Sequence, residues 1–376
     1  MEERAYWVGF NKVKGIGSVR LRGLLDFFGR LDLAWEAPAD GLRAAGLPAK
    51  VVEQVLKLRS ELDLDKELET IHRKGIRVMT WEDVDYPRRL REIDQPPPVL
   101  YWLGSYEPED DWAISIVGTR RVTAYGRQVT DELASFLAHN SVTVVSGMAR
   151  GVDGIAHDTA MRHGGRTLAV LGCGVDVVYP PEHRKLAERI AAQGALISDY
   201  APGTPPDAVN FPPRNRIISG LSPATVVVEA DKESGALITA EFATSQGRDV
   251  FAVPGNINQP QSRGTNMLIA RGAHPMLRPQ DVLEVVGMQY VQEERAARQL
   301  LPADKVEASL LRVLGTQPLH IDEIRNLSAL PIEKVSATLT MMELKGMVQQ
   351  VGGMNYIAVR EEQADYGSDI SREDNV

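Results

Sequence analysis

The stretch AISIVGTRRVTAYGRQVTDELASFLAHNSVTVVSGMARGVDGIAHDTAMRHGGRTLAVLGCG, residues 113–174, decides the fold of this chain. It repeats one unit: a short apolar run, a polar glycine turn and a helical segment. The apolar runs are Ala113–Val117, Thr143–Gly147 and Thr167–Gly172. Continuous apolar runs of this length, separated by helical segments, are typical of a parallel sheet that is covered on both faces. The sequence therefore predicts an α/β protein with a mostly parallel sheet.

The polar turns that follow the apolar runs are the first candidate contacts. Ligands of an open parallel sheet bind at the carboxyl ends of its strands, so turns at these ends are expected to line a site. Glycine lets the backbone approach a phosphate closely, and the N–H groups of a helix N-terminus favour an anion. One such turn is weak evidence, because any α/β fold needs glycine there, but several converging turns with arginines favour an anion site. The candidates in the turns are Gly118, Arg120, Arg121, Ser146, Gly147, Arg150, Gly151, Gly172, Gly174, Ser234 and Gly235.

The most specific stretch is NFPPRNRIISGLS, residues 210–222. We expect a polar loop, stiffened by proline, that presents Phe211, Arg214, Asn215 and Arg216 together. An aromatic ring beside arginines suits a single nucleic-acid strand, because the ring stacks on a base while guanidinium groups hold phosphates. The alternative is a network of arginines and carboxylates that braces the loop, and we expect at least one of the two arginines to serve in it.

The distribution of charge bears on the partner. The chain of 376 residues has a formal net charge of −9, which by itself argues against nucleic acid. Residues 1–111 carry 17 basic and 21 acidic groups, residues 112–287 carry 16 of each, and residues 288–376 carry 9 and 14. The middle region is neutral and its arginines cluster in the turns. Because phosphate binding depends on local placement, this composition is compatible with a basic groove.

The composition also excludes several classes of protein. No apolar run approaches the roughly 18–20 residues that a membrane-spanning helix needs, and the acidic start MEERAYW is unlike a signal peptide. A single cysteine excludes an internal disulfide, and scattered histidines do not predict a zinc site. We therefore expect a cytoplasmic protein with no membrane contact, no metal and no cofactor.

Motifs for nucleotide or metal chemistry are incomplete. GCGVDV, residues 172–177, lacks the third glycine of a dinucleotide fingerprint, although Asp199 lies near the spacing of its acidic residue, and no Walker-type Gly-Lys-Ser/Thr occurs. Asp153 and His157 stand four residues apart, like two metal ligands on a helix, but a third ligand is not evident and a structural hydrogen bond is favoured. Ser146 lacks the Gly-x-Ser-x-Gly elbow of a hydrolase, so a phosphate contact or a turn cap is expected.

Residues 1–75 are predicted to form a small helical domain. Val13–Gly29 places a Gly-Ile-Gly turn before an amphipathic helix, a pattern typical of a SAM-like or helix-hairpin-helix unit. Such a turn can bind phosphate through backbone N–H groups, but a plain packing module is the favoured interpretation. The segment Lys74–Gly104 is expected to lead into the sheet with a short strand, an exposed helix and the strand Val99–Leu103.

Residues 76–290 are predicted to form the main α/β domain. Beyond the opening stretch we expect a helix over Glu182–Gln193, a buried strand over Ala224–Ala230 and a helix over Ser234–Gly247. The run DVFAVPG, which ends at Gly255, is predicted to be the final strand.

The remaining residues follow a different pattern. Residues 291–304 are expected to be a linker, and residues 305–360 have the order of a winged helix-turn-helix: three helices and two short strands. A helix that reads DNA should be basic, but Ile332–Lys345 has two lysines against two glutamates. A protein contact or simple packing is therefore favoured over direct DNA reading. Residues 361–376 are acidic and predicted to be disordered.

Several segments together resemble the DprA/Smf family of DNA-processing proteins. They are GTRRVTAYG, VVSGMARGVDGIAH, LAVLGCGVDVVYPPEH, NFPPRNRIISGLS, ESGALITAEFA and VPGNINQPQSRGTNMLIARGA. The resemblance covers about residues 80–290 and continues more weakly at both ends. It implies an extended Rossmann-like fold that binds single-stranded DNA without hydrolysing it. It also implies a homodimer formed through this domain, and loading of the RecA recombinase during natural transformation.

The resemblance also implies particular contacts. The arginine of the family's first glycine turn corresponds to Arg120, and its Phe-x-x-Arg-Asn-Arg loop corresponds to residues 211–216. Lys185, in the helix expected after the third turn, completes the predicted DNA contacts. The chain departs from the family pattern at His183, where asparagine is expected, and in Asp207–Asn210, which contain no lysine.

Three functions remain open at this point. The leading interpretation is a non-enzymatic protein that binds and protects incoming single-stranded DNA and loads RecA in homologous recombination. The second is a nucleotide-processing enzyme that cleaves the N-glycosidic bond of a nucleoside monophosphate with Glu229 or Glu241. The third is a sequence-specific regulator that acts through the winged helix.

Overall fold

A computed structural model describes residues 3–288, 305–314, 318–328, 330–344 and 347–358 of the chain. The chain divides into two compact units, Met1–Val291 and Gln292–Val376, and each is described by itself. The predicted linker over residues 291–304 and the predicted tail over residues 361–376 lie outside the described residues.

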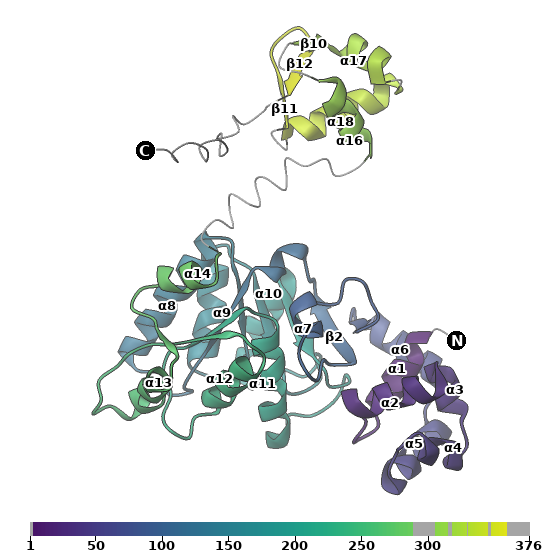
Figure 1. Ribbon diagram of the computed structural model, residues 1–376, viewed down its shortest axis with the longest axis vertical. Coiled ribbons are helices and arrows are strands. Elements are labelled where there is room, and N and C mark those ends of the chain that lie inside the picture. Colours follow the sequence, from purple (N-terminus) through teal and green to yellow (C-terminus); the bar gives the residue numbers. More distant parts are fainter. Residues whose placement is uncertain (1–2, 289–304, 315–317, 329, 345–346, 359–376) are drawn as a thin grey trace, which may run out of the picture. The chain divides into compact units, whose positions relative to one another are not determined.

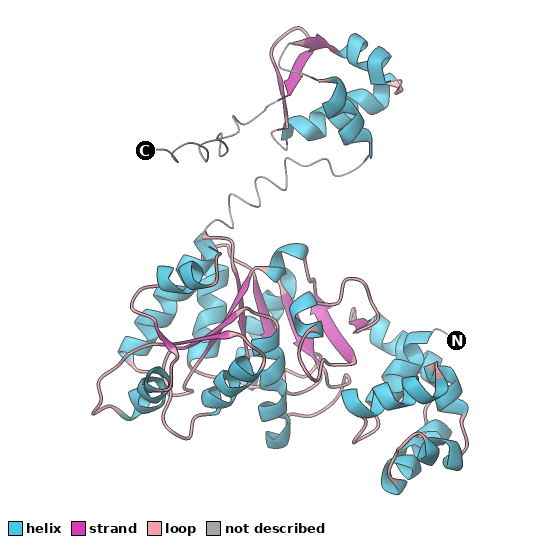
Figure 2. Ribbon diagram, viewed as in Figure 1, coloured by secondary structure: helices cyan, strands magenta, loops and turns pink. Residues whose placement is uncertain are grey.

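The first unit is built on a nine-stranded sheet, drawn in magenta in Figure 2, with the order β1-β2-β6-β5-β4-β3-β7-β8-β9. Seven neighbouring strands, from β6 to β9, run parallel. Their bounds are β3 Ala113–Val117, β4 Thr143–Ser146, β5 Thr167–Val170, β6 Ala195–Ser198, β7 Ala224–Val227, β8 Asp249–Ala252 and β9 His274–Pro275. The chain builds outward from β3 in one direction and then returns to build from β7 in the other. This reversal creates a topological switch point between β3 and β7, where α/β sheets bind ligands.

The edges of the sheet differ in how well the sequence predicts them. The expected leading extension is confirmed: β1 (Arg77–Thr80) pairs antiparallel with β2 (Val99–Gly104), which pairs antiparallel with β6. The prediction that DVFAVPG is the final strand is wrong, because β9 (His274–Pro275) adds to β8. Both residues of β9 are exposed, so no apolar run marks this strand in the sequence.

Helices cover both faces of the sheet (Figures 1 and 2). Alternate residues of β3 show the division: Ile114 and Ile116 belong to a buried cluster with α8 and α9, whereas the Ser115 hydroxyl donates to the Ile218 carbonyl of α11 at 2.7 Å. The bounds are α7 Arg88–Arg91, α8 Ala124–His139, α9 Val152–Arg162, α10 Arg184–Gln193, α11 Phe211–Gly220, α12 Gly235–Ser245, α13 Pro260–Ala270 and α14 Gln280–Val285.

The prediction of a loop over residues 210–222 is wrong. Phe211–Gly220 form the helix α11, and Pro212 and Pro213 lie in its first turn. Proline is tolerated there because the first N–H groups of a helix have no intrahelical partner. The sequence signal that was interpreted as a break instead marks the start of a helix.

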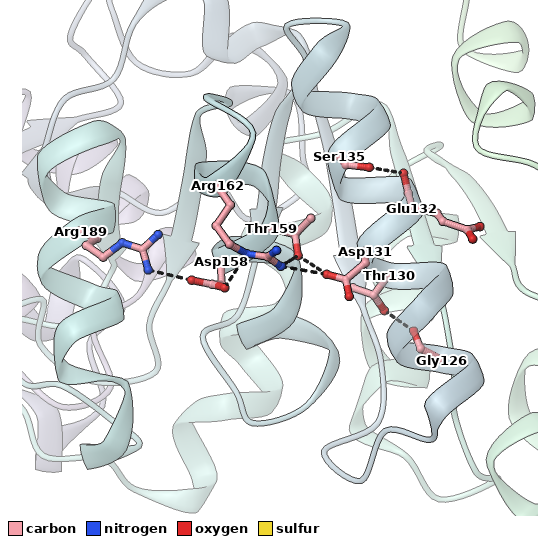
Figure 3. Close-up of polar contacts among 9 residues, drawn as sticks. All are labelled: Gly126, Thr130, Asp131, Glu132, Ser135, Asp158, Thr159, Arg162 and Arg189. Carbon is pink, nitrogen blue, oxygen red and sulfur yellow. Dashed lines mark hydrogen bonds and ion pairs between the residues drawn. The ribbon is translucent and has the colours of Figure 1, made fainter.

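An ion-pair chain crosses three of the covering helices (Figure 3). Arg162 of α9 contacts Asp131 of α8 at 3.1 Å and Asp158 of its own helix at 3.0 Å, and Arg189 of α10 contacts Asp158 at 2.7 Å. These side chains are about half exposed, so each ion pair is expected to contribute little to the free energy of unfolding. We expect the ion pairs mainly to align the three helices.

The N-terminal residues of this unit are helical, as expected. The helices are α1 Glu3–Asn11, α2 Ser18–Phe28, α3 Leu31–Glu36, α4 Ala39–Ala44, α5 Ala49–Glu61 and α6 Leu64–Arg73. Their apolar side chains belong to the same buried cluster as one face of the sheet. The rings of Trp7 and Trp81 meet edge to face at 5.7 Å between centroids.

The second unit has the predicted winged-helix order. Its helices are α16 Lys305–Val313, α17 Ile321–Ser328 and α18 Ile332–Leu344. A three-stranded sheet has the order β10-β12-β11, with bounds Leu319–His320, Asn355–Ala358 and Val348–Gln350. The two-residue strand β10 is not predicted from the sequence. Within the described parts of both units, no helix combines the length and apolar character needed to cross a membrane.

Candidate nucleic-acid interface

A pocket with a volume of about 1000 Å³ lies at the switch point between β3 and β7. Its walls come from the turn after β3, the segment after β7, the first turns of α11 and α12, and Tyr179. It brings together the following predicted contacts: Gly118, Arg120, Arg121, Phe211, Arg214, Asn215, Ser234 and Gly235. Half of the predicted set therefore converges on one site.

Two glycine turns touch each other at one wall of this pocket. Gly151 has φ +79, and a Cβ there would collide with the Thr119 carbonyl oxygen, so glycine is required. A Cβ on Gly118 would lie 2.6 Å from a methyl of Val152 at the start of α9. This close approach fills the space beneath the first turn. Arg120 and Arg121 are exposed above it, and their side chains have no hydrogen-bond or ion-pair partner in the described part of the chain.

An aromatic pair forms the next part of the pocket. Phe211 is half-buried, and its ring lies 5.6 Å from the ring of Tyr179, with 41° between their planes. Gly172 lies beneath Phe211, because a Cβ at Gly172 would be 2.8 Å from the Phe211 ring. Gly172 is itself buried, so its role is to make room for the ring rather than to contact a ligand.

Arg214 is buried, so the prediction that it contacts DNA is corrected. Its side chain is 4% exposed, and Nη1 donates to the carbonyls of Gly147, at 2.9 Å, and Val170. These carbonyls lie at the ends of β4 and β5, so the guanidinium ties two strand ends together beneath the pocket. Its Cζ atom lies 5.8 Å from the centre of the Phe211 ring. Arg214 therefore braces the pocket and supports Phe211, because burial leaves it little surface for a phosphate.

A buried carboxylate accompanies Arg214. Asp153 accepts bonds from the backbone N–H groups of Gly147 and Ala149, both at 3.2 Å. A Cβ on Gly147 would lie 2.8 Å from Asp153 Oδ2 and 3.0 Å from Arg214 Nη2. Gly147 therefore lies close to both charged groups. Burial lowers the pKa of Arg214 and raises the pKa of Asp153, and each charge opposes the shift of the other. Gly147 is thus part of the buried support.

The neighbouring histidine confirms the structural interpretation of the Asp153/His157 pair. The Thr167 hydroxyl donates to the Val144 carbonyl at 2.7 Å, so the His157 Nδ1–H donates to Thr167 Oγ1, at 2.6 Å. His157 Nε2 is buried and has no hydrogen-bond partner among the described residues. Burial lowers the pKa of His157 to about 3, and the ring is neutral at pH 7.

The other residues of α11 and α12 fix the pocket rim. Asn215 Nδ2 donates to the Gly235 carbonyl at 3.3 Å, and the Ser234 hydroxyl caps α12 by accepting from the N–H of Ala236. Arg216 forms an ion pair with Asp199 at 3.0 Å and faces away from the pocket, with both side chains 15% exposed. The prediction that at least one of the two arginines braces this segment is confirmed, and both do so.

Several predicted contacts lie outside the pocket. The Ser146 hydroxyl is buried and donates to the Ile116 carbonyl, so a phosphate contact by Ser146 is wrong. Arg150 forms an ion pair with Glu182, which lowers its capacity to hold a phosphate. Gly174 is buried against residues of the segment after β6. Lys185 is exposed on α10 and does not line the pocket.

Other residues that line the pocket are not among the contacts predicted from the sequence. Tyr179 lies beside Phe211, and its signal was the aromatic in VVYPPEH directly after a glycine turn. Asp231 and Glu233 also line the pocket from the segment that follows β7, and Ile238 lines it from α12. The two carboxylates are exposed, and a sequence pattern does not show that this segment faces the GTRR turn.

A buried carboxylate occupies the N-terminus of α8, the helix after the first strand of the parallel sheet. Glu229 is 4% exposed and accepts bonds from the N–H of Thr123, at 2.9 Å, and from its hydroxyl. In a dinucleotide-binding fold, this helix terminus holds the pyrophosphate. Glu229 therefore blocks that use of the sheet. Glu241, on α12, is exposed and does not line the pocket.

Comparison with known proteins agrees with this geometry. The family model of DNA recombination-mediator protein A matches residues 77–287, and the model of the DprA winged helix domain matches residues 294–354. Protein Smf of Synechocystis is 37% identical over 391 residues, which cover 94% of this chain and 98% of that protein. DNA processing protein DprA of Bacillus subtilis is 37% identical over 67% of this chain and 84% of its own length.

Two solved structures have the same fold. DNA processing protein A of Streptococcus pneumoniae has a TM-score of 0.66 and 32% identity, and the match covers 74% of this chain and 97% of that chain. DNA processing protein A of Helicobacter pylori, whose structure describes its single-stranded DNA binding mode, has a TM-score of 0.51 and 31% identity over 56% of this chain and 95% of its own. This chain, with its Rossmann-like sheet and winged helix, belongs to the DNA recombination-mediator protein A family, also named DprA/Smf.

Proposed function

We propose that this protein binds single-stranded DNA in the pocket between β3 and β7 without cleaving it. Arg120 and Arg121 hold phosphates, and the pair of Phe211 and Tyr179 offers a ring surface on which a base stacks. The observation that carries this proposal is the placement of two exposed guanidinium groups, without partners among the described residues, beside a half-buried aromatic pair in one pocket. The Helicobacter pylori relative supports it, since its structure describes binding of single-stranded DNA.

The wider role is part of the same proposal. We infer that the protein protects incoming DNA in the cytoplasm and loads the RecA recombinase onto it, during natural transformation or recombination, and that it acts as a homodimer. Its membership in a family of DNA recombination mediators supports this role. Recombinase loading is tested by measuring RecA filament formation on a single strand coated with its competing binding protein, with and without this chain.

A non-catalytic role is favoured by the position of the two glutamates that the enzymatic alternative requires, Glu229 and Glu241, although Asp231 and Glu233 do line the pocket. An enzyme that cleaves an N-glycosidic bond needs a carboxylate that reaches the sugar. Glu229 is occupied by the start of α8, and Glu241 lies away from the pocket. Incubation with nucleoside monophosphates and assay for released base tests this directly, and we expect no release.

The binding proposal is tested by titrating the protein with single- and double-stranded DNA over about 50–200 mM salt. We expect tighter binding of the single strand, with an affinity that falls as salt rises. Equal affinity for both forms, or binding only to the duplex, would contradict the proposal.

A further inference from the structure

A second groove, with a volume of about 710 Å³, lies in the same unit as the pocket. One wall is the turn between α1 and α2, residues 12–17, and the other is the segment that follows β6. This segment separates the two hollows. Pro206 and Ala208 line the pocket between β3 and β7, whereas Pro205, Asp207 and Val209 line the groove. A strand that leaves the pocket over this thin wall therefore enters the groove directly.

The two walls of the groove are held together by specific hydrogen bonds. Asn11 Nδ2 donates to the Asp199 carbonyl at 3.2 Å, and the Tyr101 hydroxyl donates to Asn11 Oδ1 at 2.9 Å. The Ser18 hydroxyl donates to the Pro96 carbonyl at 2.7 Å. These bonds hold the turn between α1 and α2 against the end of the sheet.

The surface of the groove suits unpaired nucleotides. Val209 is 69% exposed, and it lies beside prolines and Tyr200, which gives an apolar surface for bases. Lys12 and Arg216 are neutralised by Glu67 and Asp199. Lys14 is exposed and has no partner within the described part of the chain, so its ammonium is available for a phosphate.

The groove provides a cation that the segment between the pocket and the groove lacks. Thr204–Asn210, the wall that follows the pocket, contains no basic residue and one aspartate. Among the described residues that line the groove, the cation without an ion-pair partner is Lys14, in the turn between α1 and α2. Gly17 is the N-cap of α2 and provides no side-chain cap, so backbone N–H groups at this end add to the positive character around Lys14.

We propose that this groove binds the nucleotides of a single strand that continue from the pocket, with a phosphate on Lys14 and bases against Val209. The inference rests on the proposed function, because it extends the path of the same ligand. It assigns the Gly-Ile-Gly turn a role in binding, in place of the plain packing role favoured from the sequence.

The test uses the full chain and two lengths of oligothymidylate, roughly 5 and roughly 16 nucleotides, which span the usual range of single-strand site sizes. The variants are Lys14→Glu and Val209→Glu, whose side chains are exposed, and the control is Lys57→Glu, an exposed lysine on α5 that lies outside the groove. Circular dichroism verifies that each variant is folded.

The longer oligonucleotide should bind both groove variants about three- to tenfold more weakly, and Lys14→Glu should lower its log–log salt slope by at least about 0.7. The shorter oligonucleotide should bind the groove variants and the control like the unaltered chain, because it is held in the pocket. Equal losses for both lengths, or no loss for either, would overturn the groove proposal. Failure of the unaltered chain to bind either length would instead overturn the proposed function.

Discussion

The pocket at the sheet edge and the winged helix belong to two kinds of fold that often bind nucleic acid, but their charges are arranged differently. The pocket has Arg120 and Arg121 exposed beside an aromatic pair, and neither side chain has a partner in the part of the chain that the structure describes. In the winged helix, α18 has Lys334 next to Glu333 and the exposed side chain of Met341, and Met354, between β11 and β12, is also exposed. The local placement of cations therefore indicates where a strand binds. Neither the net charge nor the presence of a known DNA-binding motif does so.

The largest expected effect is on the support of the pocket, which has a buried ion at its centre. Arg214→Ala should lower the free energy of unfolding by about 3–5 kcal/mol, because it leaves Asp153 charged and buried without its partner. Denaturant titration measures this change. Arg121→Ala, at an exposed position in the same pocket, is the matched control and should change stability little. A loss below about 1 kcal/mol for Arg214→Ala would show that water replaces its two carbonyl contacts.

The second prediction concerns pH and the same buried support. The pKa of His157 is lowered from 6.5 to about 3, so the unfolded chain binds a proton that the folded chain does not. The stabilising contribution is complete above pH 6.5 and is lost as pH falls toward 3, at up to about 1.4 kcal/mol per pH unit. We expect His157→Gln to flatten this part of the stability profile, and His72→Gln, at an exposed position, to leave it unchanged. Parallel profiles for all three proteins would contradict the assignment.

The third prediction concerns the aromatic pair. Phe211→Ala should weaken single-strand binding by roughly 1–3 kcal/mol and leave the salt slope nearly unchanged, because stacking involves no counterion release. Fluorescence titration at two salt concentrations measures both quantities. Phe211→Tyr should retain most of the affinity. If stability collapses while the remaining folded protein binds normally, the ring serves the core instead of the ligand.

The smallest expected effect comes from removing a single cation, either from the pocket or from the winged helix. Arg120→Ala should lower the log–log salt slope of single-strand binding by about 0.7, the value for one phosphate contact. Lys334→Ala, which removes an exposed cation from α18, should leave the slope unchanged. The opposite pattern would move phosphate binding to the winged helix.

Much of the sheet could be predicted from the sequence for a clear physical reason. β3, β4 and β5 are buried on both faces, so each is a continuous apolar run that ends in glycine. β9 was missed because two exposed residues carry no such pattern. α11 was predicted as a loop because Pro212 and Pro213 are normally breakers, although the first turn of a helix accepts them.

The site was predictable in its location but not in the role of each residue. The glycine turns and Phe211 indicated the correct edge of the sheet. Arg214 was expected at the surface and is buried, because the sequence does not show that two strand-end carbonyls lie within its reach. The turn between α1 and α2 shares a groove with a segment nearly two hundred residues later, as the Asn11 contact shows, and no local pattern predicts such a meeting.

The measurement that tests the central claim most directly is binding of a single strand by the two units separately. Fragments Met1–Val291 and Gln292–Val376 follow the division of the chain, and each contains its own buried cluster. Sedimentation of each fragment with a labelled oligonucleotide, across salt, reports folding, oligomeric state and binding together. We predict that Met1–Val291 binds the strand with the salt slope of the full chain, and that Gln292–Val376 does not bind. A folded Met1–Val291 without affinity, beside a winged-helix fragment that binds, would contradict this account.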